Sequence, residues 1–89
     1  MELDKARAEI DKLDKEIVKL LEKRFNLASE IGFLKKEQNL PVYDESRERQ
    51  VLEYCAGILE NKEYSKYICD IYFQIMNICK DIQRLKDKE

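Results

Sequence analysis

The sequence predicts an all-α fold of three helices, one long and two shorter, in a single domain over residues 1–89. Two observations support this prediction. Apolar residues recur at steps of three and four along most of the chain, the period of a helix that buries one face. The chain has only 2 Gly and 1 Pro, too few for the many tight turns of a β-sandwich or a barrel.

The first helix is predicted from Leu3 to Leu34, where the apolar stripe is longest. The segment contains no Pro, and its only Gly, Gly32, lies near its end. Asn39 and Pro41 mark the break, because proline cannot continue a helix and disfavours helical geometry in the residue before it. Position 24 of the stripe holds an arginine, and its apolar members are Leu3, Ala6, Ile10, Leu13, Ile17, Leu20, Leu27, Ile31 and Leu34.

The second helix is predicted to begin after Asp44, whose carboxylate can accept N–H bonds from the first turn. Residues 61–63 are the next predicted break between helices, and the third helix runs from about Ser65 to near the C-terminus. The stripe of the second helix is Val51, Cys55 and Ile58, and that of the third is Ile68, Tyr72, Ile75, Cys79 and Ile82.

The first helix is too long for a compact chain of this size. About 33 helical residues span roughly 50 Å, whereas a compact globule of this length has a diameter near 30 Å. The overhang is still apolar, at Leu3, Ile10 and Leu13, so it needs cover from elsewhere. We expect a second copy to supply it in an intertwined helical homodimer. The alternative is a kinked first helix that folds back on a monomer.

Composition and charge exclude several classes of function. With 17 basic and 19 acidic residues the net charge is −2, which disfavours a nucleic-acid partner. No apolar run approaches the roughly 18 residues of a membrane span, and the N-terminus resembles no signal sequence. We therefore expect a cytosolic protein without a membrane partner. The absence of His and the wide spacing of Cys55, Cys69 and Cys79 predict no metal, no cofactor and no hydrolytic triad.

Charged and polar residues interrupt the apolar stripes. On one face of the first helix, a wedge of about 60° holds Arg24, Ala28, Ile31 and Lys35, so the two cations point the same way. Glu48, next to Arg47, extends the stripe of the second helix, and Gln83 lies on an inward face of the third. If these side chains converge, cations outnumber acids, which favours an anionic ligand. The alternative is that they pair across helices and fix the register.

Arg7 is informative because of its distance from Arg24. The two residues are 17 positions apart, or about 25 Å along a helix, so no small molecule contacts both within one chain. In an antiparallel dimer, Arg7 of one copy can approach Arg24 of the other. Taken alone, Arg7 is a surface residue.

Together these residues resemble the all-helical class of chorismate mutase, in a short monofunctional form, over essentially the whole chain. The resemblance implies an intertwined homodimer with two active sites. It implies the cofactor-free rearrangement of chorismate to prephenate, on the way to phenylalanine and tyrosine. It is carried by Arg7-x-x-Ile10-x-x-Leu13-Asp14, Leu20-Leu21-x-x-Arg24-x-x-Leu27-Ala28-x-x-Ile31-Gly32-x-x-Lys35, Pro41-Val42-x-Asp44-x-x-Arg47-Glu48, and Tyr72, Met76, Cys79 and Gln83.

The resemblance also implies a role for each residue that binds the substrate carboxylates. Arg24 and, from the partner chain, Arg7 bind the two carboxylates, and Arg47 assists one of them. The family commonly has serine at the position of Cys79. A thiol is a weaker donor, so this carboxylate contact is expected to be lost or replaced.

Four further residues are implied to act at the reacting atoms. Lys35 and Gln83 donate to the ether oxygen, while Glu48, helped by Asp44, accepts from the substrate hydroxyl. Two alternative functions remain: an isochorismate-pyruvate lyase of the same fold and a non-catalytic helical dimer.

The alignment of the third helix also leaves an alternative open. The match at Gln83 requires a shift of one residue, and the unshifted alignment places Lys80 and Arg84 at the family's positions instead.

Overall fold

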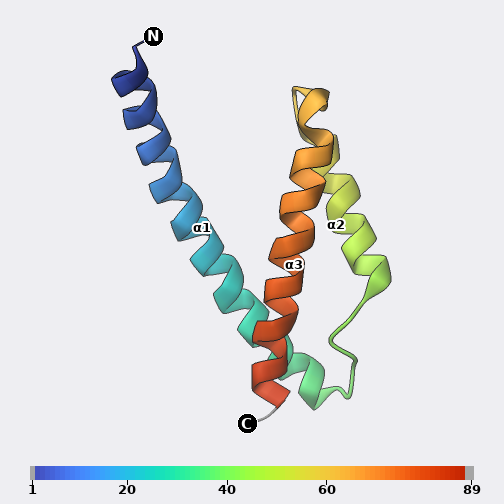
Figure 1. Cartoon of the computed structure of the whole chain (residues 1–89). Helices are drawn as coiled ribbons and strands as arrows, with labels where there is room; N and C mark the ends of the chain where they lie inside the picture. The colour runs from blue at the N-terminus through green and yellow to red at the C-terminus, as the bar shows by residue number, and fades with distance from the viewer. Residues whose placement is uncertain (1, 88–89) are drawn as a thin grey trace.

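A computed structural model of the chain describes the backbone of residues 2–87 and the side chains of residues 2–85 (Figure 1). The outermost residues of the predicted domain 1–89, Met1, Lys88 and Glu89, lie outside the described residues. The elements are α1 (Leu3–Glu37), α2 (Glu45–Gly57), a short 3₁₀ turn η1 (Lys62–Tyr64) and α3 (Ser65–Asp87). No strand occurs in the part of the chain that is described, and the predicted all-α fold is confirmed.

α1 is a single unbroken helix, so the alternative of a kinked first helix is wrong. Asn39, just beyond its end, has a φ of 57°, the left-handed conformation that often terminates helices. The N–H of Leu40 then donates to the carbonyl oxygen of Lys35 at 2.8 Å, which completes a Schellman motif. This motif ends α1 before Pro41, as predicted.

α2 begins where the sequence predicts. Asp44 is its N-cap, and the Asp44 Oδ1 accepts from the backbone N–H of Arg47 at 3.0 Å. The helix ends at Gly57, before the last residue of its apolar stripe, and Lys62 Nζ donates to the carbonyl oxygens of Ala56 and Gly57 at 3.1 and 2.7 Å, which stabilises this end. Ile58, predicted to lie in the buried stripe, is outside the helix and exposed, so this part of the prediction is wrong.

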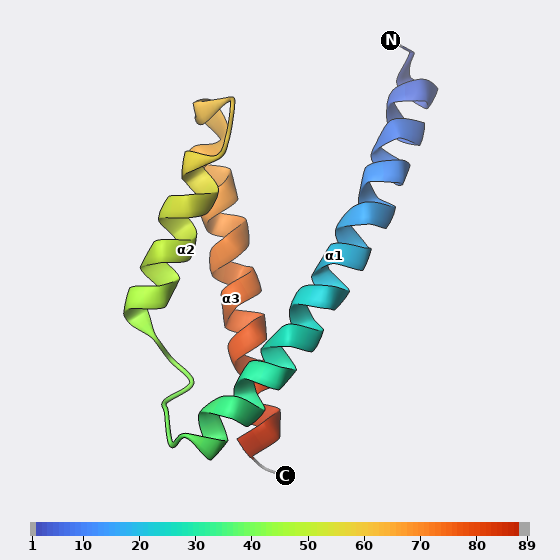
Figure 2. The ribbon, with the colours of Figure 1, turned by 180° about the vertical axis from the view of Figure 1, so that it is seen from behind.

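α3 is the central helix of the fold. α2 runs alongside it, and α1 crosses its C-terminal part at an angle, so that the N-terminal half of α1 diverges from the other two helices (Figures 1 and 2). The buried residues gather at the crossing of α1 and α3: Ala28, Gly32, Met76, Cys79 and Gln83. Gly32 permits this approach, because a Cβ at this position would lie 2.7 Å from the Cα of Gln83.

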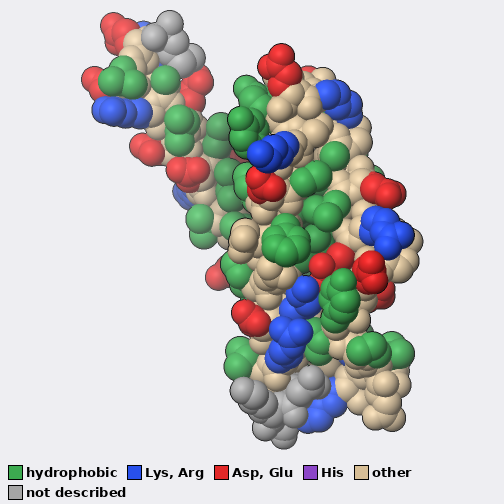
Figure 3. Space-filling view, turned by 45° about the vertical axis from the view of Figure 1, so that its right-hand side comes forward, with side chains coloured by type: hydrophobic (Ala, Val, Ile, Leu, Met, Phe, Trp, Pro, Cys, Tyr) green, Lys and Arg blue, Asp and Glu red, His purple; other side chains and the backbone are tan. Residues whose placement is uncertain are grey.

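The two halves of α1 differ in burial, although large apolar side chains are exposed in both, including that of Leu27 at 57%. The packed half (residues 21–37) contributes Ala28 and Gly32 to the crossing with α3. The projecting half (residues 3–20) keeps its apolar stripe in solvent, with Ile10 54% and Leu20 63% exposed. Figure 3 shows hydrophobic side chains, in green, at many places on the visible surface of the molecule. The apolar overhang predicted from the sequence is therefore present in the single chain.

The single chain is also more extended than a compact monomer of its length. Its extents are 53 × 25 × 15 Å, and its Cα radius of gyration is 16.0 Å, against about 12 Å for a compact chain of this length. Its accessible surface is 7419 Å², about 1,900 Å² more than the ~5,500 Å² expected for a compact monomer of 10.7 kDa. None of the helices in the described part of the chain combines the length and apolarity needed to cross a bilayer.

Candidate functional site

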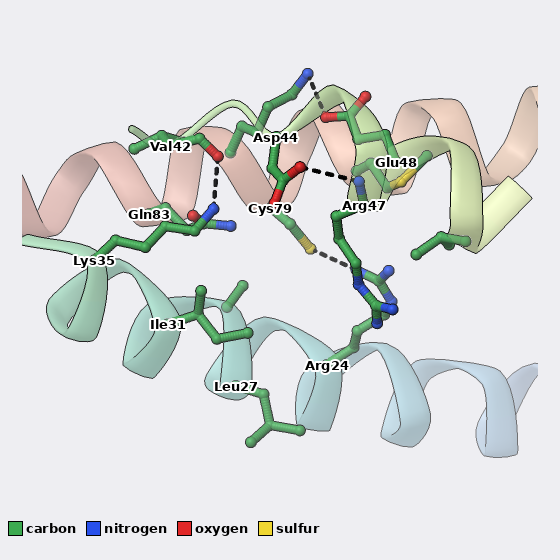
Figure 4. Close-up of a pocket in the computed structure, with 14 residues that line it drawn as sticks. Arg24, Leu27, Ile31, Lys35, Val42, Asp44, Arg47, Glu48, Cys79 and Gln83 are labelled. Atoms are coloured by element: carbon green, nitrogen blue, oxygen red, sulfur yellow. Dashed lines mark hydrogen bonds and ion pairs between the residues drawn. The ribbon is translucent and has the colours of Figure 1, made fainter. Parts of the chain in front are cut away.

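A cavity of about 430 Å³ lies where the three helices meet, between the packed half of α1, the N-terminal part of α2 and the C-terminal part of α3. Its apolar wall is formed by Leu27, Ala28, Ile31, Val42, Val51 and Met76. Seven of the eight predicted site residues line it: Arg24, Lys35, Asp44, Arg47, Glu48, Cys79 and Gln83 (Figure 4). Residues that are far apart in the sequence therefore lie together around one cavity.

Arg24 enters the cavity from α1 and is held by two residues of α3. Its Nη1 donates to the Cys79 Sγ at 3.0 Å, and its Cζ lies 5.8 Å from the centroid of the Tyr72 ring. The sulfur thus accepts a bond from the arginine. A guanidinium has five N–H donors, so this contact leaves donors for a ligand.

Tyr72 presents an uncharged ring to Arg24. Burial raises the pKa of the Tyr72 hydroxyl, and the neighbouring Cys55 thiol raises it further, while the charge of Arg24 lowers it. The net direction is upward, so the phenol stays protonated at neutral pH. Arg24 is consequently oriented by a neutral ring and a sulfur, neither of which cancels its charge.

Lys35 enters the cavity from the last turns of α1, about three turns beyond Arg24 (Figure 4). Its Nζ donates to the carbonyl oxygen of Val42 at 2.7 Å, which ties residues 38–44, the segment between α1 and α2, to the cavity. An ammonium has three N–H donors, so two remain after this bond. Lys35 can hold the segment and a ligand at the same time.

Gln83 is the most deeply buried polar side chain of the cavity, with 8% of its surface exposed. Its Oε1 has no hydrogen-bond partner among the described residues. A buried carbonyl oxygen without a donor is costly, and a ligand that carries a donor can supply the missing bond. The amide can also rotate by 180° and present its NH₂ group to an acceptor.

Arg84, the residue that the alternative alignment places at the position of Gln83, lies elsewhere. Arg84 Nη1 pairs with Asp81 Oδ1 at 3.5 Å on the exposed face of α3, and Arg84 does not line the cavity. In the structure it is Gln83 that lines the cavity.

Glu48 enters from α2 and is paired with a residue that the sequence analysis did not assign to the site. The Lys80 Nζ lies 2.9 Å from the Glu48 Oε2, and it also lies 4.8 Å from the centroid of the Tyr43 ring. The sequence places Lys80 at the site only in the unshifted alignment of the third helix. Its spacing does carry a signal, because it lies four residues after Met76 and three before Gln83 on the inward face.

The cavity carries an excess of positive charge. Its lining includes four cations, Arg24, Lys35, Arg47 and Lys80, and two acids, Asp44 and Glu48. This balance favours a ligand with two negative charges, such as a dicarboxylate. Among the described residues, no group of three or more His, Cys, Asp or Glu side chains is placed to hold a metal ion.

Arg7 is the one predicted site residue that the cavity of its own chain does not include. It lies on the exposed, projecting half of α1, about 25 Å along the helix from Arg24. Its predicted contribution from a partner chain stays a prediction.

Comparisons with known proteins place the chain in a family. The family model for chorismate mutase type II matches residues 6–84. The chain is 35% identical over 89 aligned residues to the bifunctional chorismate mutase/prephenate dehydratase of Aquifex aeolicus, covering 93% of this chain and 24% of that protein. It is 27% identical to the chorismate mutase of Methanocaldococcus jannaschii, over 83% of this chain and 75% of that one.

The fold has a solved counterpart, a conserved hypothetical protein from Pyrococcus furiosus. The TM-score is 0.76 at 42% sequence identity, and the match covers 91% of this chain and 93% of that one. The chain spans a quarter or less of the length of the first curated relatives it matches. The family match itself extends over nearly all of the helical structure. The chain therefore belongs to the chorismate mutase type II family.

Proposed function

We propose that this protein is an isomerase that converts chorismate to prephenate, a step towards phenylalanine and tyrosine. One observation carries the proposal: a cavity with four cations, two acids and a buried amide whose oxygen has no partner among the described residues, in a chain of the chorismate mutase type II family. The expected substrate is a dianion with one hydroxyl group and an ether oxygen. The hydroxyl, the ether oxygen and one carboxylate each have a matching side chain in the cavity, and the second carboxylate is assigned to Arg7 of the partner subunit.

The reaction needs no nucleophile and no cofactor. In this intramolecular Claisen rearrangement one C–O bond breaks and one C–C bond forms within the same molecule. The protein must hold a flexible dianion in a chair-like pose and stabilise the negative charge that grows on the ether oxygen. Enzymatic acceleration begins at about 10⁶-fold, or roughly 8 kcal/mol, and one well-placed donor supplies about 3 kcal/mol. Two donors and an ordered substrate are enough to reach this range.

The carboxylates of the substrate are assigned to arginines. Arg24, oriented by Cys79 and Tyr72, binds one carboxylate through its free N–H donors. The partner subunit's Arg7 binds the other, and Arg47 at the start of α2 assists. The thiol of Cys79 then acts through Arg24, since it already accepts a bond from that guanidinium.

The reacting oxygen is assigned to Lys35 and Gln83. Lys35 keeps two N–H donors after its bond to Val42, and the Gln83 Oε1 has no partner among the described residues, so the amide can rotate and present its NH₂ group. Both donate to the ether oxygen as its charge grows. Glu48 accepts from the substrate hydroxyl, and Asp44, which caps α2, holds the start of the helix that carries Glu48.

A second copy of the chain is part of the proposal. The surface in excess of a compact monomer, about 1,900 Å² per chain, corresponds to about 3,800 Å² for a pair, within the range of obligate homodimers. In an intertwined dimer the projecting half of α1 lies on the partner and carries Arg7 towards the partner's cavity. The homodimer and its shared site explain why one chain leaves this half uncovered.

Incubation of the purified protein with chorismate tests the proposed function. Loss of the ultraviolet band of chorismate, with prephenate as the product, is the expected result. No consumption of chorismate would contradict the mutase, and release of pyruvate from isochorismate would then indicate the lyase. A stable dimer without either activity would indicate a non-catalytic module. The cytosolic location stays a prediction from the sequence.

A further inference from the structure

Glu48 presents an electrostatic difficulty for the proposed function. It is a carboxylate on the wall of a cavity that is assigned to a dianion, where like charges repel. Its side chain is 18% exposed, so water screens it only in part. To accept a bond from the substrate hydroxyl, this group has to be held in place and its charge offset.

Lys80 is placed to do both. Its Nζ lies 2.9 Å from the Glu48 Oε2, and the Lys80 side chain is 15% exposed. Two other ion pairs of the chain, Arg49–Glu45 and Arg84–Asp81, each join residues of one helix, and their side chains are more than half exposed. The pair of Lys80 and Glu48 is unlike these, because it joins α3 to α2 inside the cavity.

A third element also contacts Lys80. Its Nζ lies 4.8 Å from the centroid of the Tyr43 ring, which belongs to the segment between α1 and α2. The preceding residue, Val42, accepts the bond from Lys35. Two lysines of the cavity, from α1 and α3, therefore hold neighbouring residues of the segment that leads to Asp44 and Glu48. Figure 4 shows this segment passing over the cavity, with the ion pair of Glu48 marked beside it.

We propose that Lys80 is a positioning residue, whose ammonium fixes the Glu48 carboxylate and offsets its charge so that Glu48 can receive the hydroxyl of a doubly negative substrate. The inference rests on the proposed function and adds to it a residue that acts through Glu48. It also accounts for the charge of the cavity. With Lys80 the lining has four cations against two acids, a surplus of two that matches a dianion; without it the surplus falls to one.

A double-mutant cycle tests the inference. Lys80→Met keeps the length of the side chain and removes its charge, and Glu48→Gln removes the group on which Lys80 acts. We expect Lys80→Met alone to lower kcat/KM for chorismate by about 10- to 100-fold, within the range seen for residues in contact. In the Glu48→Gln background the same change is expected to alter kcat/KM by less than about threefold, because its target is gone.

Two further variants separate charge from packing. Lys80→Arg keeps the charge and is expected to retain activity within about threefold, whereas a role of the aliphatic stem alone would leave Lys80→Met as active as the wild type. Arg84→Met is the matched control, since it breaks an exposed ion pair on the same helix and is expected to leave both kcat and KM unchanged. If Lys80→Met does not fold by circular dichroism, Lys80→Gln takes its place in the cycle.

Equal losses from Lys80→Met in the two backgrounds would overturn the inference, as would wild-type kinetics of Lys80→Met. Calorimetric binding of a bicyclic dicarboxylate that mimics the chair-like geometry provides a measure that does not depend on turnover. There, Lys80→Met is expected to weaken binding only when Glu48 is present. If the wild-type protein leaves chorismate unchanged, the proposed function fails, and the binding cycle still decides the role of Lys80.

Discussion

The two halves of α1 share one sequence pattern and have different surroundings. In the packed half, the small residues Ala28 and Gly32 beside the stripe are buried, and Arg24 and Lys35 line the cavity, although the stripe residues Leu27, Ile31 and Leu34 are 57%, 42% and 43% exposed. In the projecting half, the same steps of three and four continue through Ile10 to Leu20, and no residue there is buried. An apolar stripe therefore predicts that a face needs cover, and it does not say which chain supplies the cover.

This contrast links the stability of a dimer to the completeness of the cavity. The half that lacks cover also carries Arg7, and the half that has cover carries Arg24. If a second copy covers the projecting half, burial of the stripe and completion of the site are one event. The experiments below test each half in turn.

The largest effect is expected from loss of the two arginines. Arg7→Ala and Arg24→Ala each leave a substrate carboxylate without its cation, which costs about 3–5 kcal/mol for a buried pair, or roughly 10²- to 10³-fold or more in kcat/KM. Steady-state kinetics with chorismate measure this loss. A mild effect of Arg7→Ala would mean that the projecting half contributes no substrate-binding residue to the site.

Mixing the two variants sharpens the comparison. In a refolded equimolar mixture, half of the dimers are hybrids, and each hybrid contains one site with both arginines. Activity is therefore expected to recover to about one quarter of the wild-type value, as the two-fold symmetry of a shared site requires. Absence of recovery in hybrids verified by mass spectrometry would contradict a shared site.

Lys35→Ala tests the packed half alone. Removal of one donor to a growing oxyanion is expected to lower kcat by about 10²- to 10³-fold, while the dimer remains folded by sedimentation and circular dichroism. Lys66→Ala, an exposed lysine in the first turn of α3, serves as the control and is expected to be neutral. Near-normal turnover of Lys35→Ala would refute the role assigned to this ammonium.

Ile10→Glu tests the projecting half. Two copies of Ile10 are expected to be buried per dimer, each worth about 1.5–3 kcal/mol, so the dissociation constant is expected to rise by about 10²-fold or more. Lys12→Glu adds the same residue on the opposite face of the helix and is expected to leave the dimer intact. Sedimentation equilibrium measures both, and an unchanged dimer of Ile10→Glu would mean that another partner or none covers this half.

The two glycines form a matched pair for the crossing of α1 and α3. A Cβ at Gly32 would lie 2.7 Å from the Cα of Gln83, so Gly32→Ala is expected to destabilise the fold by about 1–3 kcal/mol and to displace the Gln83 amide. Nothing lies within 4 Å of a Cβ at Gly57, so Gly57→Ala is expected to be neutral or stabilising by up to about 1 kcal/mol. Urea unfolding measures the free energy of unfolding of both variants, and equal values would contradict the close crossing of α1 and α3.

The smallest effect is expected from Cys79→Ser. A serine hydroxyl accepts a bond from Arg24 at least as well as the thiol does, and it restores the residue common in the family. We expect kcat/KM to stay within about threefold of the wild type or to improve slightly. A large loss would show that the thiol has a role beyond holding Arg24.

The local features of the fold follow from the sequence alone. The start of α1 and the start of α2 could be predicted, and the end of α1 was predicted at Leu34 instead of Glu37, because helical periodicity, the break before Pro41 and the Asp44 cap are set by neighbouring residues. The inward direction of Arg24 and Lys35 could be predicted for the same reason, since a helix fixes which residues share a face.

Only the tertiary structure decided which faces meet and how closely. The contact of Gly32 with Gln83 and the pairing of Lys80 with Glu48 depend on the crossing of helices that are far apart in sequence, which periodicity does not specify. The exposure of Ile58 and of the projecting half likewise became visible only once the helices were placed. The physical reason is range: caps and periods act over a few residues, whereas the cavity exists only where three separate helices converge.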